Sequence, residues 1–135
     1  MNVTPVTTGL SEVVVVSETE ASVLGCIIGS LGLKVEKLGS SAELGPYLQD
    51  HTPRLLVLDA ALSGVNGTSV ADRVKKIARL KDTPVIVLCE AEGRLRAQAE
   101  FCKADRVILK PFAASALKDA VAELLSFQND LSVAA

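Results

Sequence analysis

Short apolar runs alternate with longer stretches of helical periodicity along almost the whole chain. Most of these runs consist of Val, Leu and Ile with no polar residue inside them, which is typical of strands buried on both faces of a parallel sheet. The runs lie at Val13–Val16, Leu33–Leu38, Leu55–Leu58, Val85–Leu88 and Val107–Leu109. Because a helical stretch follows each run, the pattern predicts five βα units.

Apolar residues at helical spacing define the segments that follow the runs. The first segment has Leu24, Ile27, Ile28 and Leu31 at positions i, i+3, i+4 and i+7, and Gly32 is its expected C-cap. The other predicted helices are a short one opened by a capping box at Ser40 and Glu43, one with Val70, Val74 and Ile77 after a turn at Asn66-Gly67, one over about 92–103, and one with Leu117, Val121 and Leu124.

Five βα units with helices on both faces of the sheet are satisfied by the flavodoxin-like strand order 2-1-3-4-5. The predicted fold is therefore an α/β three-layer sandwich. Ligands of such sheets bind beyond the carboxyl ends of the first and third strands, so we expect Ser17, Glu18 and Asp59 to meet there. Residues 11–127 form the expected domain, residues 1–10 a flexible N-terminus, and residues 128–135 a frayed tail or the start of a linker.

Composition narrows the classes of function. Of the 135 residues, 49% are apolar and 22% are charged, and the formal net charge is −2. This balance gives no overall attraction to nucleic acid or to anionic lipid. The first ten residues lack the pattern of a signal peptide, and no apolar run is long enough to span a bilayer. We therefore expect a cytoplasmic protein without membrane contact.

Cysteine and histidine chemistry is not favoured. Cys26, Cys89 and Cys102 never occur as Cys-x-x-Cys, so they predict neither a disulfide framework nor a zinc site, and we interpret them as reduced core thiols. His51 is the single histidine, and we interpret it as a surface residue. A Ser-His-Asp or Cys-His site would have no other imidazole to use.

Three motifs follow one another in the order and spacing of a known family. Leu55–Asp59 is an apolar run that ends in an aspartate and leads into the loop Ala60–Gly67, Thr83–Leu88 is a second run that contains Pro84, and Lys110-Pro111-Phe112 closes the last one. On these motifs the chain, from Glu12 to about Phe127, resembles the receiver domain of bacterial response regulators, including the stand-alone chemotaxis regulators. The resemblance implies a signalling domain rather than an enzyme, and a cis Lys110–Pro111 bond.

The resemblance also implies a phosphoacceptor site. Asp59 matches the acceptor aspartate, and Lys110 matches the lysine that neutralises charge on the transferring oxygens. Glu18, Asp59 and the backbone carbonyl of Ala61 match the ligands of one Mg²⁺. The implied partners are a histidine kinase or phosphotransfer protein, a downstream protein, and a second copy bound through helix four, strand five and helix five. No direct contact with nucleic acid is expected.

Three departures from the family pattern fall in or beside this site. Ser17 stands where the family has the first of two acidic residues, so Mg²⁺ should bind more weakly. Cys89 occupies the position of the switch hydroxyl, and a thiol is a weak hydrogen-bond donor. Val107 occupies the position of the switch aromatic and has no ring to move.

Two other interpretations remain open. A pseudo-receiver would keep the fold and bind its partner without phosphorylation, with Asp59 and Lys110 as a structural ion pair. A nucleotide-binding or flavin-binding domain at the same sheet edge is less favoured. The segment Ser17–Glu20 offers no glycine-rich cradle and would repel a phosphate.

Overall fold

The computed structural model describes residues 13–62, 65–77, 80–90 and 103–134. Its centre is a five-stranded parallel sheet with the order β2-β1-β3-β6-β7. The strands are β1 (Val13–Val16), β2 (Val35–Leu38), β3 (Leu55–Asp59), β6 (Val85–Glu90) and β7 (Arg106–Lys110). Counted along the chain, this is the predicted order 2-1-3-4-5, and the α/β sandwich is confirmed.

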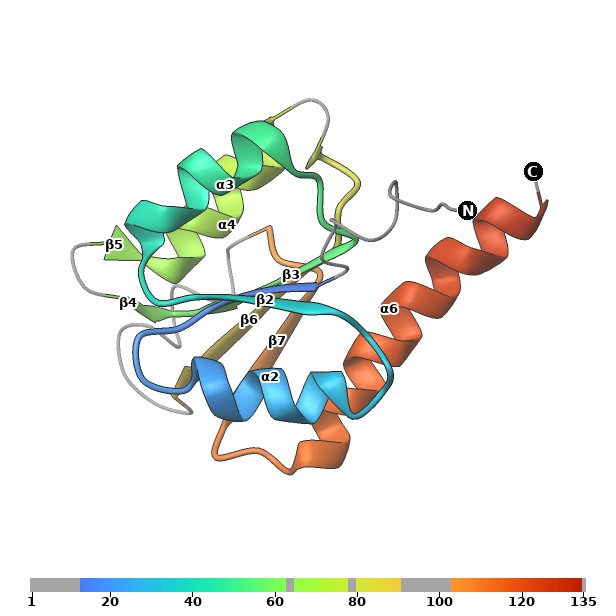
Figure 1. Ribbon diagram of the computed structural model, residues 1–135, viewed down its shortest axis with the longest axis horizontal. Helices are drawn as coiled ribbons and strands as arrows, with labels where there is room; N and C mark the ends of the chain where they lie inside the picture. The colour runs from blue at the N-terminus through green and yellow to red at the C-terminus, as the bar shows by residue number, and fades with distance from the viewer. Residues whose placement is uncertain (1–12, 63–64, 78–79, 91–102, 135) are drawn as a thin grey trace, which may run out of the picture.

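Helices cover both faces of the sheet (Figure 1). On one face lie the 3-10 turn η1 (Ser41–Glu43), α3 (Leu44–Asp50) and α4 (Gly67–Lys76). On the other face lie α2 (Ala21–Gly29) and α6 (Ala114–Ala134). The predicted helix over 92–103 falls almost entirely outside the described residues. Within those residues, no helix has both the length and the apolar character needed to cross a membrane.

The core is divided in two by the sheet, because successive strand residues point to opposite faces. Val14 and Val16 of β1 pack in the cluster that contains Leu44 and Leu48 of α3. Val13 and Val15 pack in the other cluster, together with residues of α2 and α6. Every residue of β1 and β3 is buried, which is why these strands appear in the sequence as continuous apolar runs.

Helix ends account for two errors in the predicted core. Leu31 was predicted to continue the apolar stripe of α2, but this helix ends at Gly29 and Leu31 is 39% exposed. Ile77 was predicted to line α4, but that helix ends at Lys76 and Ile77 is 40% exposed. The C-cap of α2 is Ser30 rather than the predicted Gly32, which follows two residues later with a φ of 86°, a conformation that favours glycine.

Two predicted turn signals take a different form in the structure. Asn66-Gly67 is not a free turn, because Asn66 ends the short strand β5 (Val65–Asn66), which pairs with β4 (Ala61–Leu62), and Gly67 begins α4. The capping box at Ser40 and Glu43 is also altered. The Glu43 carboxylate accepts hydrogen bonds from the Gly39 N–H and the Ser40 hydroxyl, while the Ser40 side chain caps no backbone amide.

The cysteine and histidine interpretations hold only in part. Cys89 is buried, as predicted, and Cys102 lies outside the described residues. Cys26 is exposed, because the buried stripe of α2 is formed by Leu24 and Ile28 and a residue midway between them points away from the core. His51 is half-buried rather than fully on the surface, and its ring stacks on Tyr47 at a centroid distance of 4.2 Å.

The helix α6 continues as far as Ala134, so the segment expected to be a tail from residue 128 is helical up to that point. Figure 1 shows its last turns extending beyond the sheet. Whether this extension leads into a linker remains a prediction.

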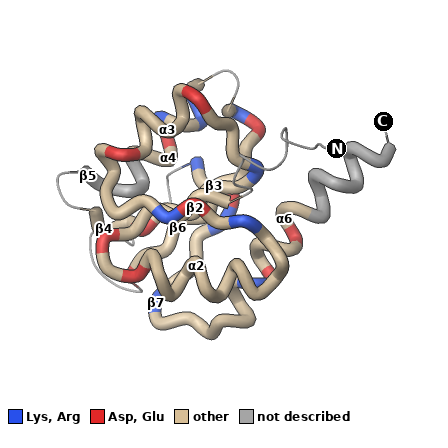
Figure 2. The backbone as a smooth tube through the Cα atoms, in the orientation of Figure 1, with Lys and Arg blue, Asp and Glu red and all other residues tan. Residues whose placement is uncertain are grey.

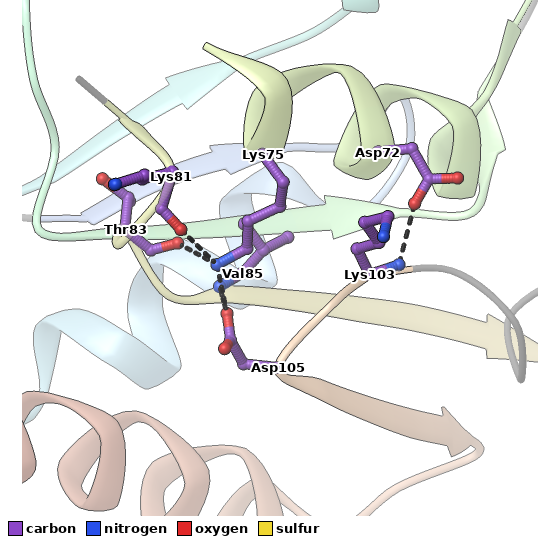
Figure 3. A network of polar contacts seen from close by, with 7 residues as sticks. All are labelled: Asp72, Lys75, Lys81, Thr83, Val85, Lys103 and Asp105. Atoms are coloured by element: carbon purple, nitrogen blue, oxygen red, sulfur yellow. Dashed lines mark hydrogen bonds and ion pairs between the residues drawn. The ribbon is translucent and has the colours of Figure 1, made fainter. Parts of the chain in front are cut away.

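A polar cluster joins α4 to the amino ends of β6 and β7 (Figure 3). Lys75 Nζ lies 2.7 Å from Asp105 Oδ2 and also donates to the carbonyl of Thr83 at 2.7 Å. Asp105 Oδ2 accepts the N–H of Val85 at 2.7 Å, and the Asp105 N–H donates to the carbonyl of Val85. Nearby, Asp72 of α4 accepts the N–H of Lys103. We call Lys75 and Asp105 the amino-edge pair.

Candidate functional site: an aspartate, a lysine and a second acid at the carboxyl edge of the sheet

Asp59 is the last residue of β3, and its side chain is only 4% exposed. Its Oδ1 accepts the N–H of Ala61 at 3.0 Å. Its Oδ2 lies 3.3 Å from the Ser17 hydroxyl, which donates to it, and 3.0 Å from Lys110 Nζ. The burial of a carboxylate is unfavourable unless it is paired and hydrogen-bonded, and Asp59 meets both conditions.

Strand register explains why Ser17 reaches Asp59. The strands β1 and β3 are parallel neighbours in which Val16 pairs with Leu58, so Ser17 and Asp59 leave the sheet at the same level. Ser17 is 1% exposed. The structure thus brings together the first and third strand ends, as predicted, although the buried side chain from the first strand is a hydroxyl rather than a carboxylate.

Lys110 ends β7, two strands away from β3, and its side chain is 16% exposed. Its Nζ contacts two carboxylates, at 3.0 Å from Asp59 Oδ2 and 2.9 Å from Glu20 Oε1. Burial lowers the pKa of Lys110, but its close contacts with the carboxylates of Glu20 and Asp59 raise it by more, so the net pKa is above its usual value. Lys110 is therefore a fully charged ammonium at neutral pH. The Lys110–Pro111 bond is cis, as the resemblance implies.

Glu20 is the site residue that sequence reasoning missed. It stands at the N-cap position of α2, and its side chain is 44% exposed although its Oε1 atom is buried. The contact of Oε1 with Lys110 is an ion pair without the alignment of a hydrogen bond. The N–H of Glu20 donates to the Ser17 hydroxyl at 3.0 Å, and this local turn brings Glu20 back toward the sheet. The only signal in the sequence was a second acid in the same loop.

Two of the three predicted Mg²⁺ ligands belong to exposed residues. Glu18 is exposed, and Ala61, whose carbonyl was the predicted third ligand, is also exposed. Among the described residues, no three His, Cys, Asp or Glu side chains converge in a group that could hold a metal ion. The donors at this edge are all oxygens, which suits Mg²⁺, but few of them are charged, so the residues fit a weakly held, well-hydrated ion.

The two substituted switch positions lie in an apolar environment. Cys89, in β6, is 1% exposed, forms no disulfide and belongs to the core cluster beneath α3 and α4. Val107, in β7, is partly buried and packs against that same cluster. Neither residue places a hydroxyl or an aromatic ring beside Asp59.

An open pocket of about 400 Å³ adjoins the site. It has Glu20, Glu90 and Lys110 at its polar side. Its apolar lining is formed by Val23, Leu24, Ile27, Pro111 and Phe112. Acidic and basic segments are otherwise interspersed along the described backbone (Figure 2). The site is therefore a place where Lys110 can be reached from outside.

Comparison with known proteins places this geometry in a family. The family model for the response regulator receiver domain matches residues 13–122. Response regulator Rre1 of Synechocystis sp. is 31% identical over 98 residues, which are 71% of this chain and 42% of that protein. The phosphate regulon transcriptional regulatory protein PhoB of Rhizobium meliloti is 29% identical over 119 residues, 86% of this chain and 52% of that protein. The chain thus spans about half the length of these two relatives.

Solved receiver domains share the fold. The signal receiver domain of a signal transduction histidine kinase from Syntrophus aciditrophicus matches with a TM-score of 0.80 at 27% identity, over 86% of this chain and 90% of that one. The receiver domain of a sensor histidine kinase from Pseudomonas aeruginosa, solved with a magnesium ion coordinated in its active site cleft, matches with a TM-score of 0.78 at 17% identity, over 87% of this chain and 98% of that one. Because the family model spans most of the sequence and the sheet carries the expected aspartate and lysine, the chain belongs to the response regulator receiver domains of two-component systems.

Proposed function

We propose that this receiver domain accepts a phosphoryl group on Asp59 from a histidine kinase or a phosphotransfer protein. The observation that carries the proposal is the approach of Lys110 Nζ to within 3.0 Å of the buried Asp59 Oδ2. A buried carboxylate with a fixed lysine beside it is preorganised for a reaction in which negative charge develops on transferring oxygens. In this proposal the domain acts through protein partners and is not an enzyme with a small-molecule substrate of its own.

The transfer step forms a bond between an Asp59 carboxylate oxygen and phosphorus. With a phosphohistidine donor the P–N bond breaks, and the imidazole nitrogen keeps the electron pair and then takes a proton. The Ala61 N–H and the Ser17 hydroxyl hold the carboxylate in place, and Lys110 offers its ammonium to the transferring oxygens. Ser17 and Asp59 are nearly excluded from solvent, so reorganisation of the site is small.

We propose that Mg²⁺, when bound, is held by Asp59, the Ala61 carbonyl and Glu18. It would neutralise charge on the incoming phosphoryl group. Since Ser17 supplies a hydroxyl where the family has a carboxylate, binding is expected to be weaker than in receivers with two acids at the end of the first strand.

The added charge of about −1.5 to −2 at neutral pH is the signal to the downstream partner. We propose that this partner, or a second copy of the chain, binds the face made by β7 and α6. Helix four, the third part of the predicted interface, lies almost entirely outside the described residues. A net charge of −2 favours protein partners over direct nucleic-acid contact.

One observation favours a second candidate, a pseudo-receiver that binds its partner without phosphorylation. Cys89 and Val107 lie in an apolar cluster, so the switch hydroxyl and the switch aromatic are both missing. A phosphoryl group on Asp59 would then have no switch side chain to reposition. Under this alternative, an Asp59→Ala variant that folds stably keeps its partner binding unchanged.

Incubation of the full chain with acetyl phosphate and Mg²⁺, followed by intact mass measurement, tests the first proposal. The expected result is a mass increase of one phosphoryl group on the wild-type chain and none on an Asp59→Asn variant. Wild-type and variant chains that both keep their original mass would overturn the proposal and leave the pseudo-receiver. A gain of mass on both would place the acceptor elsewhere.

A further inference from the structure

We propose that Glu20 is a built-in competitor for the phosphoryl group, and that its carboxylate must release Lys110 before Asp59 can react. This inference rests on the proposed function and deepens it. It assigns to Glu20 a positioning role, exerted through Lys110, that limits how readily the site accepts an anion.

The geometry places Glu20 where an incoming anion would be needed. The Lys110 ammonium has three N–H donors, and two of the directions around it are taken by Asp59 Oδ2 at 3.0 Å and Glu20 Oε1 at 2.9 Å. A phosphoryl group attached to Asp59 would need its own oxygen next to Lys110. The Glu20 carboxylate already fills such a place with a negative charge, and like charges at this separation repel.

The carboxylate of Glu20 does not cap the helix that it precedes. A side chain at the N-cap position usually accepts a hydrogen bond from an amide of the first turn. Glu20 occupies the N-cap of α2 and forms no such bond, so its carboxylate faces Lys110 instead. The turn held by the Glu20 N–H and the Ser17 hydroxyl fixes the backbone from which this side chain reaches inward.

Glu20 is also free to move out. Its side chain is 44% exposed, whereas that of Lys110 is 16% exposed and that of Asp59 is 4% exposed. It borders the open pocket of about 400 Å³ described above, so a rotation of the side chain meets solvent rather than packed core. The contact is therefore reversible, as a competitor must be, and Asp59 and Lys110 stay in place when it is broken.

The test compares Glu20→Gln with Glu90→Gln in the full chain. Glu90 is exposed, lines the same pocket and lies at the same edge of the sheet, so its substitution removes the same charge without touching Lys110's ion pairs. Two probes are applied in Mg²⁺ buffer: the rate of acetyl phosphate labelling, and the affinity for beryllofluoride, an anion that imitates a bound phosphoryl group. Thermal melting of each variant checks that it is folded, and Glu20→Ala provides a second substitution at the same position.

Glu20→Gln is expected to label about five- to tenfold faster and to bind beryllofluoride about five- to tenfold more tightly than wild type, the range for a partly screened pair of like charges. Glu90→Gln is expected to stay within about twofold of wild type. Glu90 is the residue paired with Lys110 across β6 and β7, but its carboxylate is exposed and, among the described residues, forms no ion pair with Lys110. Equal effects of the two substitutions, or a slower and weaker Glu20→Gln, would overturn the inference while the proposed function stands. Tighter beryllofluoride binding by Glu20→Gln with no labelling of any variant would support the inference and refute phosphorylation of Asp59. Neither labelling nor binding in any variant would refute both.

Discussion

Two lysine–aspartate pairs lie at opposite ends of the same sheet, and they differ in what surrounds the lysine. At the amino edge, Lys75 Nζ lies 2.7 Å from Asp105 Oδ2, and it also donates to the backbone carbonyls of Thr83 and Lys81 (Figure 3). At the carboxyl edge, Lys110 Nζ lies 3.0 Å from Asp59, and its other partner is a second carboxylate, that of Glu20.

The carboxylates differ as well. Asp105 Oδ2 also accepts the N–H of Val85, and Lys75 also donates to the carbonyl of Thr83. The amino-edge pair therefore connects α4 to the starts of β6 and β7 through hydrogen bonds to the backbone. The Asp59 side chain is more deeply buried, at 4% exposure against 38% for Asp105, yet its lysine borders an open pocket. The same pair of residue types therefore has a structural role at the amino edge and a proposed reactive role at the carboxyl edge. The neighbours of the lysine determine which role it has.

The largest expected effect on stability separates the two aspartates. Asp105→Asn removes the negative charge paired with Lys75 and weakens the hydrogen bond from the Val85 N–H, so it is expected to lower the free energy of unfolding by about 2 kcal/mol. Asp59→Asn removes a buried charge, while Lys110 keeps Glu20, so the change is expected to stay within about 0.5 kcal/mol. Urea denaturation of both variants measures the difference. A larger loss of unfolding free energy in Asp59→Asn than in Asp105→Asn would contradict the assignment of a structural role to the amino-edge pair and a reactive role to Asp59.

A smaller effect concerns metal binding at the carboxyl edge. Ser17→Asp restores a second carboxylate beside Asp59 and is expected to raise Mg²⁺ affinity about tenfold, equal to about 1.4 kcal/mol. Titration of Mg²⁺ followed by NMR of residues near Asp59 measures it. Thr83→Asp, at the amino edge, is the matched control and is expected to leave Mg²⁺ affinity unchanged. An unchanged affinity in Ser17→Asp would show that this edge does not hold the ion.

The smallest effect is a pH dependence. Because the pKa of Lys110 is raised in the folded state, its ion pairs stabilise the fold at pH values below the unfolded pKa, and this contribution is lost as the pH rises through the folded pKa. The difference in unfolding free energy between wild type and Lys110→Met is expected to be constant from about pH 7 to about pH 9 and to shrink above about pH 10.5. Denaturant titrations at each pH measure it. A difference that grows with rising pH has the wrong sign for a raised pKa.

Much of the fold could be predicted because its signals are local and repeated. The buried runs of β1, β3 and β6 are apolar throughout, and burial on both faces requires this. The juxtaposition of Asp59 and Lys110 followed from parallel topology and from motif spacing. Helix ends were harder, since the stripe of α2 continues in the sequence to Leu31 although the helix stops at Gly29.

The role of Glu20 could not be predicted, because it depends on the path of a loop. Glu18 and Glu20 are both acids in the same segment, and composition does not distinguish them. The distinction comes from one hydrogen bond, between the Glu20 N–H and the Ser17 hydroxyl, that turns the chain so that Glu20 faces Lys110 while Glu18 is exposed. The substitution at Ser17 was visible in the sequence as a lost carboxylate, but its second role, as the acceptor that shapes this loop, was not.

The most direct test of the contrast between the two edges is acetyl phosphate labelling of Lys110→Met and Lys75→Met, measured by intact mass at a temperature where both variants are folded. The predicted result is labelling about 100-fold slower for Lys110→Met, as for the loss of one preorganised cation, and a rate within about twofold of wild type for Lys75→Met. Labelling of Lys110→Met at the wild-type rate, or equal slowing in the two variants, would contradict the assignment of the carboxyl-edge lysine to phosphoryl chemistry.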